Sequence, residues 1–328
     1  MKYVFAFLLM VFLLGGCVSA PNSAANTASE EDGRLIIVAS VFPQYDFIRQ
    51  IAGDKVVLYM LISPGAEPHA FEPSPSDMIA LNRADLIVYV GGDGEAWVDT
   101  ILDSIDNPNQ RRVALIDLVD AVYKELVEGM EDDHGEDYGY DDHDDDDDHN
   151  HDDELDEHVW TSPLNAISIV QQLAWILIEL DPDNSEYYFE NSMAFIQELR
   201  ELDAAFAEVA ASGVRSTVVF ADRFPFRYLM DSYGIDYFAA FPGCSSETQA
   251  SPATIAFLID KVKADNIPIV FHVEFSSRSI ANVVAQATGA RLLELHSTHN
   301  VSHADFTGGV TYLDIMNRNL EQLREALN

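Results

Sequence analysis

The sequence predicts an α/β protein of two lobes, each with a parallel sheet, joined by one long helix. Short apolar runs alternate with helical patterns from Arg34 onward, and the alternation resumes near Ser216 after a purely helical stretch. Strands that alternate with helices form a parallel sheet covered on both faces. The 328 residues, of which 48% are hydrophobic, are enough for two domains with ordinary cores.

The first lobe is predicted over residues 34–183. Its helical patterns, several of which open with proline or close with glycine, lie at 43–53, 76–84 and 162–180, and its apolar strand patterns lie at 34–42, 55–62 and 85–92. Ligands of parallel sheets sit beyond the carboxyl ends of the strands. His69 lies in the loop after the second strand pattern, so we expect it at that edge.

The second lobe is predicted over residues 213–328, after a linking helix at 184–212. This helical pattern contains no glycine or proline and would span ~40 Å at 1.5 Å per residue, enough to reach from one lobe to the other. In the lobe itself, Ser251 followed by Pro252 is typical of a helix start. Strand patterns lie at 216–222, 235–241, 267–275 and 291–296, with helical patterns at 225–234, 251–266, 277–289 and 312–328.

The charge of the chain limits its partners. The formal net charge is -38, and only 18 lysines and arginines are spread along the whole sequence. Nucleic acid is excluded as a partner, because phosphate binding needs a basic stripe. An anionic membrane surface would also repel the chain, whereas cations suit it.

The amino terminus predicts export. Residues 1–16 combine one lysine with an apolar run too short to span a membrane comfortably, which is typical of a signal peptide. Cys17 directly after Leu-Gly-Gly resembles a bacterial lipobox, so we expect a lipid on its thiol and a flexible tether over residues 17–33. Cys244 is the only other cysteine, so a lipidated Cys17 leaves no intramolecular disulfide.

Three histidines occupy positions that favour a metal site. His69 follows a strand of the first lobe, and His296 ends a strand of the second. His158 precedes a helix whose predicted N-cap is Ser162. Imidazoles converging on a cleft from two lobes are the donors that a closed four-ligand transition-metal site requires.

Other histidines belong to an acidic insertion at about residues 131–157. The segment has almost no apolar residues to offset the entropy of ordering, so we expect it to be disordered without metal. It is either a solvated, solubilising loop or a low-affinity collector that raises the local metal concentration. Its histidines are His134, His143, His149 and His151.

Two motifs carry a family resemblance. "PGAEPHAFEPSPSDM" and "DEHVWTSP" resemble signatures of the zinc/manganese solute-binding proteins of ABC transporters, and the likeness extends from about Arg34 to Asn328. The resemblance implies two α/β lobes on a linking helix, with His69 and His158 as metal ligands. It also implies that Glu72 and Trp160 pack around the ligands rather than bind metal.

The second lobe departs from the family pattern. Ala221 stands where the resemblance implies a third histidine ligand, and Asp222 follows it. His296 stands where the family usually has an aspartate. The predicted ligand set is therefore His69, His158, His296 and Asp222, with His272 and His299 in reserve.

The resemblance implies an extracytoplasmic, lipid-anchored, monomeric binding protein without catalytic activity. It would deliver a divalent metal to the permease and ATPase subunits of an ABC importer. Zinc is favoured over manganese, which stays possible, because imidazoles prefer zinc. Two alternatives remain: a metal-dependent hydrolase with Glu274 as its base, and a surface adhesin that binds metal for stability.

Overall fold

The computed structural model describes residues 33–66, 71–130, 154–243 and 250–328. Residues 34–328 form one compact unit. The predicted signal peptide, Cys17, the tether, His69 and the four histidines of the acidic insertion lie outside the described residues. Glu154 and Leu155 are attached to the first lobe, because Lys124 N–H donates to the Glu154 carbonyl at 2.7 Å and Leu155 pairs with Tyr123.

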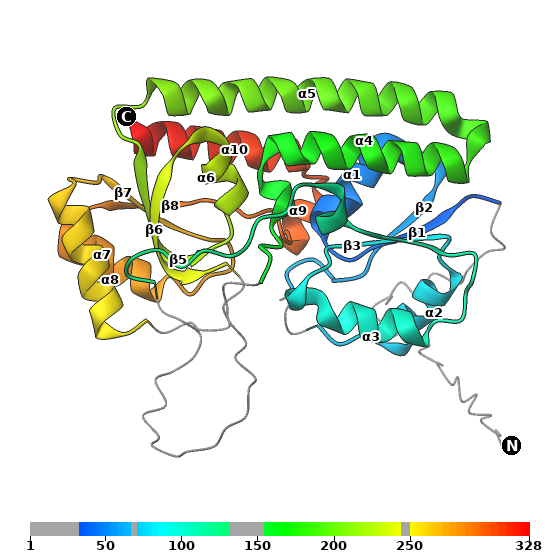
Figure 1. The fold of residues 1–328 in the computed structure, drawn as a ribbon, viewed down its shortest axis with the longest axis horizontal. Coiled ribbons are helices and arrows are strands. Elements are labelled where there is room, and N and C mark those ends of the chain that lie inside the picture. The colour runs from blue at the N-terminus through cyan, green and yellow to red at the C-terminus, as the bar shows by residue number, and fades with distance from the viewer. Residues whose placement is uncertain (1–32, 67–70, 131–153, 244–249) are drawn as a thin grey trace, which may run out of the picture. The chain divides into compact units, whose positions relative to one another are not determined.

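Each lobe contains one four-stranded parallel sheet, and the two sheets have equivalent topology (Figure 1). The first has the order β2-β1-β3-β4 and the second the order β6-β5-β7-β8. The predicted fold class is confirmed. The strands are β1 (Ile36–Ala39), β2 (Val57–Met60), β3 (Leu86–Tyr89), β4 (Arg111–Ala114), β5 (Thr217–Phe224), β6 (Asp236–Pro242), β7 (Ile269–His272) and β8 (Arg291–Glu294).

Helices cover both faces of each sheet. Leu81 of α2 and Leu102 of α3 pack on one face of the first sheet, and Leu258 of α7 and Val284 of α8 pack on one face of the second. The helices are α1 (Phe42–Ala52), α2 (Pro75–Arg83), α3 (Ala96–Ser104), α4 (Pro163–Leu180), α5 (Ser185–Ser212), α6 (Arg227–Tyr233), α7 (Pro252–Ala264), α8 (Ser279–Thr288), α9 (His303–Thr307) and α10 (Tyr312–Leu327).

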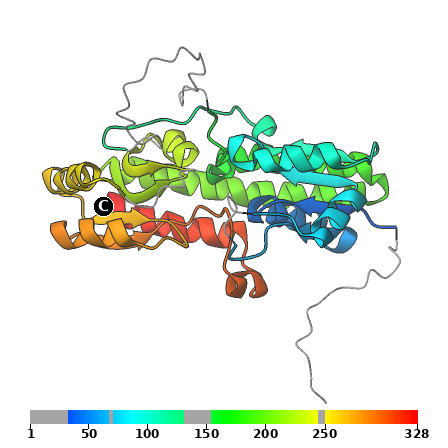
Figure 2. The same ribbon diagram turned by 90° about the horizontal axis from the view of Figure 1, so that it is seen from below.

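Helix α5 is the predicted link between the lobes. Its 28 residues span about 42 Å, and it runs along the same side of both sheets (Figures 1 and 2). Asn191 of α5 donates to the carbonyl of Ile51 in the first lobe at 3.0 Å. Tyr233 of the second lobe donates to Asp203 of α5 at 2.9 Å. One rigid helix is thus fastened to both lobes.

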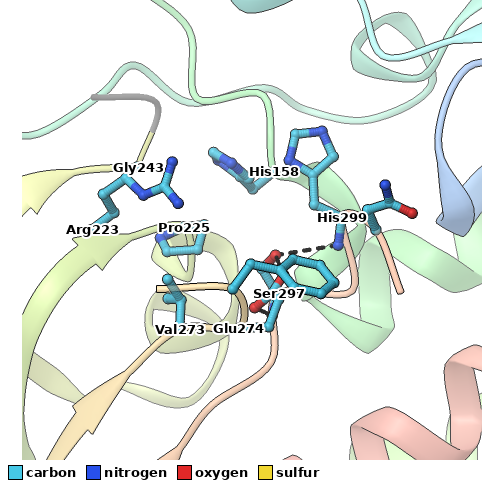
Figure 3. Close-up of a pocket in the computed structure, with 10 residues that line it drawn as sticks. His158, Arg223, Pro225, Gly243, Val273, Glu274, Ser297 and His299 are labelled. Carbon is cyan, nitrogen blue, oxygen red and sulfur yellow. Dashed lines mark hydrogen bonds between the residues drawn. The ribbon is translucent and has the colours of Figure 1, made fainter. Parts of the chain in front are cut away.

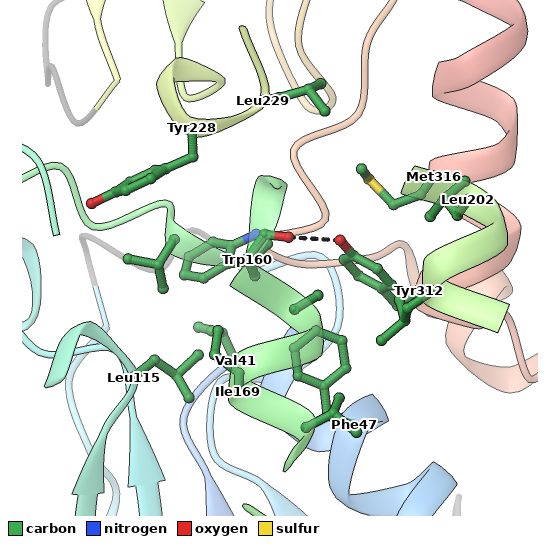
Figure 4. Close-up of a cluster of buried hydrophobic side chains, with 14 of the residues drawn as sticks. Val41, Phe47, Leu115, Trp160, Ile169, Leu202, Tyr228, Leu229, Tyr312 and Met316 are labelled. Atoms are coloured by element: carbon green, nitrogen blue, oxygen red, sulfur yellow. Dashed lines mark hydrogen bonds between the residues drawn. The ribbon is translucent and has the colours of Figure 1, made fainter. Parts of the chain in front are cut away.

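One hydrophobic cluster includes residues of both lobes and of α4, α5 and α10 (Figure 4 shows part of it). Trp160 and Tyr312 are fully buried in it, and the Tyr312 hydroxyl donates to the carbonyl of Trp160 at 2.7 Å. Phe47 of the first lobe packs edge-on against Tyr312 of the second, with ring centroids 5.0 Å apart. Because a close-packed core resists shear, any movement between the lobes must preserve this shared layer.

Glu95 is a buried carboxylate near the carboxyl end of β3. Its Oε2 accepts the Val90 N–H at 2.6 Å, and its side chain is 4% exposed. Burial, together with the nearby charge of Glu157, raises the pKa of Glu95 from 4.5 to about 7. In the folded protein this group is therefore protonated at mildly acidic pH and ionises as the pH rises past neutrality.

This raised pKa predicts a pH-dependent stability. The contribution of protonated Glu95 to the free energy of unfolding is fully present below about pH 4.5. It is lost as the pH rises through about 7, and the loss is on the order of 3 kcal/mol. Glu95→Gln removes the ionisation, so it should raise the unfolding temperature more at pH 8 than at pH 5. Thermal unfolding of both proteins at the two pH values measures this, with Glu208→Gln, exposed on α5, as control. An equal change at both pH values would contradict it.

Candidate metal centre

A small cavity of about 40 Å³ lies between the lobes, beside the carboxyl ends of β5 and β7 (Figure 3). Such a volume holds an ion and one or two waters, not a bulky metabolite. Its lining residues come from both lobes and include imidazole, carboxylate and guanidinium groups. They are His158, Arg223, Pro225, Gly243, Val273, Glu274, Phe275, Ser297, His299 and Asn300.

His158 enters this cavity from the first lobe. It precedes the 3-10 turn Val159–Thr161, which leads into α4. Asp156 Oδ1 accepts the His158 backbone N–H at 2.9 Å and lies 3.1 Å from its Nδ1. Nδ1 is therefore the donor, since an ionised carboxylate only accepts. Nε2 then carries the lone pair, and the carboxylate fixes the ring orientation, as in metal-bound histidines generally.

The second lobe holds the Asp156–His158 segment in place. Tyr228 of α6 donates its hydroxyl to the Asp156 carbonyl at 2.7 Å and accepts the Val122 N–H at 3.1 Å. Burial raises the pKa of Tyr228, so it stays a neutral donor. Ser162 is the N-cap residue of α4 as predicted, but its hydroxyl bonds Ser232 at 2.8 Å rather than the helix backbone.

His299 approaches His158 from the loop after β8. The two rings are nearly perpendicular, with centroids 5.7 Å apart. Trp160 packs on His299 at 5.1 Å between centroids, and its indole N–H donates to the Ser297 carbonyl at 2.8 Å. The loop thus positions an imidazole from the second lobe against one from the first.

The same loop is fastened to the segment that leads into His69. Asn300 donates its amide to the carbonyls of Ser63 and Ala66 at 2.9 and 2.8 Å. Gly65 N–H donates to the Val301 carbonyl at 2.8 Å. Residues 63–66 therefore end beside the cavity wall, because Asn300 also lines it.

The comparison with known proteins decides the family. Residues 37–326 match the model described as zinc-uptake complex component A, periplasmic, or ZnuA. The chain belongs to the ZnuA family. This confirms the family that the two sequence motifs resemble.

One relative matches this chain over nearly its whole length, and another is longer than this chain. The high-affinity zinc uptake system protein ZnuA of Bacillus subtilis is 30% identical over 97% of both chains. The zinc-binding lipoprotein AdcA of Streptococcus pneumoniae is 31% identical over 92% of this chain, which spans only 58% of AdcA. The Zn(II)-bound ZnuA-like domain of AdcA has a TM-score of 0.71 at 27% identity and is matched over 99% of its length, with 90% of this chain covered.

The predicted ZnuA-type ligands fall into two groups. His158 and the reserve residue His299 are brought together. His69 lies outside the described residues, although the segment before it reaches the cavity. In the part of the chain that the structure describes, no group of three or more His, Cys, Asp or Glu side chains is placed to hold a metal ion.

His296 and Asp222 do not line the cavity. His296 Nδ1 accepts the Thr298 N–H at 3.0 Å and lies 3.7 Å from Glu274 Oε1, so this nitrogen is already engaged by protein groups. Asp222 accepts the backbone N–H groups of Arg223 and Val273 at 2.9 and 3.3 Å. His272 is 3% exposed, with Nδ1 3.0 Å from the Val273 carbonyl.

Glu274 is the carboxylate that does line the cavity. It is 8% exposed, and Ser297 donates its backbone N–H to Oε2 at 2.8 Å and its hydroxyl to Oε1. These bonds fasten β7's end to the His299 loop. Each carboxylate oxygen retains a second lone pair that a metal can use.

Sequence reasoning missed two cavity residues. Arg223, next to Asp222 near the end of β5, points its guanidinium toward the His158 ring (Figure 3). Gly243, just beyond β6, lies against the same ring. The sequence predicts the carboxylate of Asp222 as a ligand at the end of β5, but Arg223 is the residue there that lines the cavity.

Gly243 has no room for a side chain. An added Cβ would lie 2.9 Å from Cε1 of His158 and 3.0 Å from the Phe224 carbonyl oxygen. Gly243→Ala should therefore displace the imidazole and weaken zinc binding on the order of tenfold, the lower range for disturbing a ligand's support. A zinc competition titration measures this. Gly308→Ala, at a negative φ away from the cavity, is the control and should bind zinc normally. Unchanged affinity in Gly243→Ala would show that the ring does not bind metal in this position.

Proposed function

We propose that this protein binds a divalent transition metal, most suitably zinc, outside the membrane and delivers it to an ABC importer. The observation that carries the proposal is the approach of His158 and His299 from opposite lobes, with His158 oriented by a buried carboxylate. Family membership and the names of the relatives support zinc as the cargo. Imidazole donors favour the same metal over manganese.

The proposed ligands combine the sequence motifs with the cavity. His69 and His158 supply imidazoles from the first lobe, and His299 supplies the imidazole of the second lobe in preference to His296. Glu274 is the carboxylate donor that the cavity favours, and Asp222 is the alternative if the end of β5 moves when metal binds. His272, which is buried outside the lining, is the weakest candidate.

We propose a binder rather than a hydrolase. A catalytic zinc needs an open position for water beside a general base. Glu274, the predicted base of the rival hypothesis, already accepts two hydrogen bonds from Ser297, which hold its carboxylate at the cavity wall. The small cavity also leaves little space for an ester, peptide or phosphate substrate.

The test is a zinc titration of the full chain and of a chain lacking residues 132–153. Both should bind one tight equivalent of zinc, and only the full chain should bind further, weaker equivalents at the acidic insertion. Loss of the tight equivalent on deletion would place the site in the insertion. The zinc-loaded protein should show no turnover of ester, peptide or phosphate substrates. Turnover abolished by a chelator would favour the hydrolase.

The location and partners are part of the same proposal. Cys17 would be the lipid anchor, and residues 17–33 would tether a monomer to the outer side of the cell membrane. The permease and ATPase subunits of the importer would be its partners. Cys17→Ser should release the protein from membranes into the soluble extracytoplasmic fraction, and continued membrane retention would refute the anchor.

A further inference from the structure

Glu157, the residue before His158, packs against the turn that follows β3. This turn covers residues 91–97 and contains three glycines. Gly94 donates its backbone N–H to Oε1 of Glu157. Glu157 is only 3% exposed, and glutamate is a residue type that is rarely buried without partners. The backbone of the turn therefore holds the side chain that stands next to a proposed metal ligand.

The glycines of the turn leave the space that Glu157 fills. A Cβ on Gly92 would lie 2.8 Å from both Cγ and Oε1 of Glu157, and a Cβ on Gly94 would overlap its Oε2. At both positions, the three nearest heavy atoms from elsewhere in the chain belong to Glu157. Because only glycine lets the backbone approach another group so closely, the turn accepts Glu157 only while these positions carry no side chain.

The turn is fixed by contacts of its own. Oε2 of Glu95 accepts the backbone N–H groups of Val90 at 2.6 Å and Gly91 at 3.4 Å, and the side chain is buried. Trp97, at the other end of the turn, packs against Phe71 with ring centroids 5.0 Å apart. A turn that is closed by a buried carboxylate and anchored by an aromatic pair is a rigid support for Glu157.

His158 lies between two residues that are fastened to different lobes. The carbonyl of Asp156 accepts the Tyr228 hydroxyl of the second lobe at 2.7 Å, whereas Glu157 is held by the turn of the first lobe. We propose that Glu157 is a positioning residue of the metal centre, which keeps the His158 imidazole at a fixed place on the first lobe through its bond to Gly94. Such supporting groups orient a ligand before the metal arrives, so their loss weakens binding. The proposal rests on the proposed function, in which His158 binds zinc.

The test is a double-mutant cycle that is measured by zinc competition titration. Glu157→Ala should lower zinc affinity about tenfold or more, the range for removing a group that orients a ligand. Gly94→Ala should lower it similarly, because the added methyl displaces the Glu157 carboxylate. In the double variant, Gly94→Ala should add little to the loss, because the methyl then enters the space that Glu157 has vacated. Losses that add in the double variant would overturn the proposal.

A conservative variant separates positioning from charge. Glu157→Gln lacks the charge but keeps a side-chain oxygen that accepts the Gly94 N–H, so it should bind zinc nearly as tightly as the unmodified chain. The absorption bands of bound Co²⁺, which report its coordination geometry, should shift in Glu157→Ala and not in Glu157→Gln. Glu190→Ala, exposed on α5, is the control and should change neither measurement. Zinc binding by Glu157→Gln that is as weak as in Glu157→Ala would contradict a positioning role.

The outcomes distinguish this proposal from the proposed function. Tight zinc binding by the unmodified chain that persists undiminished in Glu157→Ala and Gly94→Ala would refute the positioning role and leave the transport proposal standing. Absence of tight zinc binding in the unmodified chain would refute the transport proposal itself. Thermal unfolding of each variant verifies that it is folded before zinc is added.

Discussion

His158→Ala should lower zinc affinity on the order of a thousandfold. The variant removes a ligand whose orientation is already set by Asp156, so the remaining donors must recruit water in its place. Each tenfold change in affinity corresponds to about 1.4 kcal/mol of binding free energy, so this factor corresponds to a loss of several kcal/mol. A competition titration with a chromogenic chelator measures it. His303→Ala, exposed at the start of α9, is the matched control and should bind zinc normally.

The same titration ranks the ligands of the second lobe. His299→Ala should lower zinc affinity nearly as much as His158→Ala. His296→Ala should lower it less, because the His296 ring already accepts the Thr298 N–H. Glu274→Gln should lower zinc affinity more than Asp222→Ala does, since of these two residues only Glu274 lines the cavity. The reverse order in the first pair would restore His296 as the predicted ligand, and the reverse order in the second would restore Asp222. Zinc affinity should also fall as the pH drops through roughly 6.5, because imidazoles must be deprotonated to bind metal.

Trp160→Ala should destabilise the fold by about 3–5 kcal/mol, the range for removing a large aromatic from a core. The indole is fully buried between the lobes and donates to the Ser297 carbonyl. At about 2–4 °C per kcal/mol for a large domain, the unfolding temperature should fall by roughly 10 °C.

Trp175→Ala is the matched control for this prediction. Trp175 lies on α4 with 54% of its side chain exposed, so its removal should shift the unfolding temperature by little. An equal fall of the unfolding temperature in the two variants would show that the shared core does not connect the lobes as described. Trp160→Ala should also weaken zinc binding, since the indole packs on His299.

Local patterns in the sequence were sufficient to predict most of the helices and strands. Helix starts depend on side chains one to three residues away, and Ser251 accepts the Thr254 N–H as its position before Pro252 predicts. The linking helix was predictable because no glycine or proline interrupts it. Short elements were missed. Strand β4 reads "RRVA" and lacks an apolar run, and the five-residue α9 is too short to show a periodicity.

Periodicity, helix caps and a contiguous motif are enough to predict the fold class, the family and His158 as a candidate ligand. Which groups of the second lobe reach the cavity depends on packing between the lobes. His296 and His299 are three residues apart, and their roles differ because a backbone N–H occupies one ring while Trp160 of the other lobe packs on the second. Arg223 and Gly243 meet His158 through contacts between lobes distant in sequence, and no local pattern encodes such contacts.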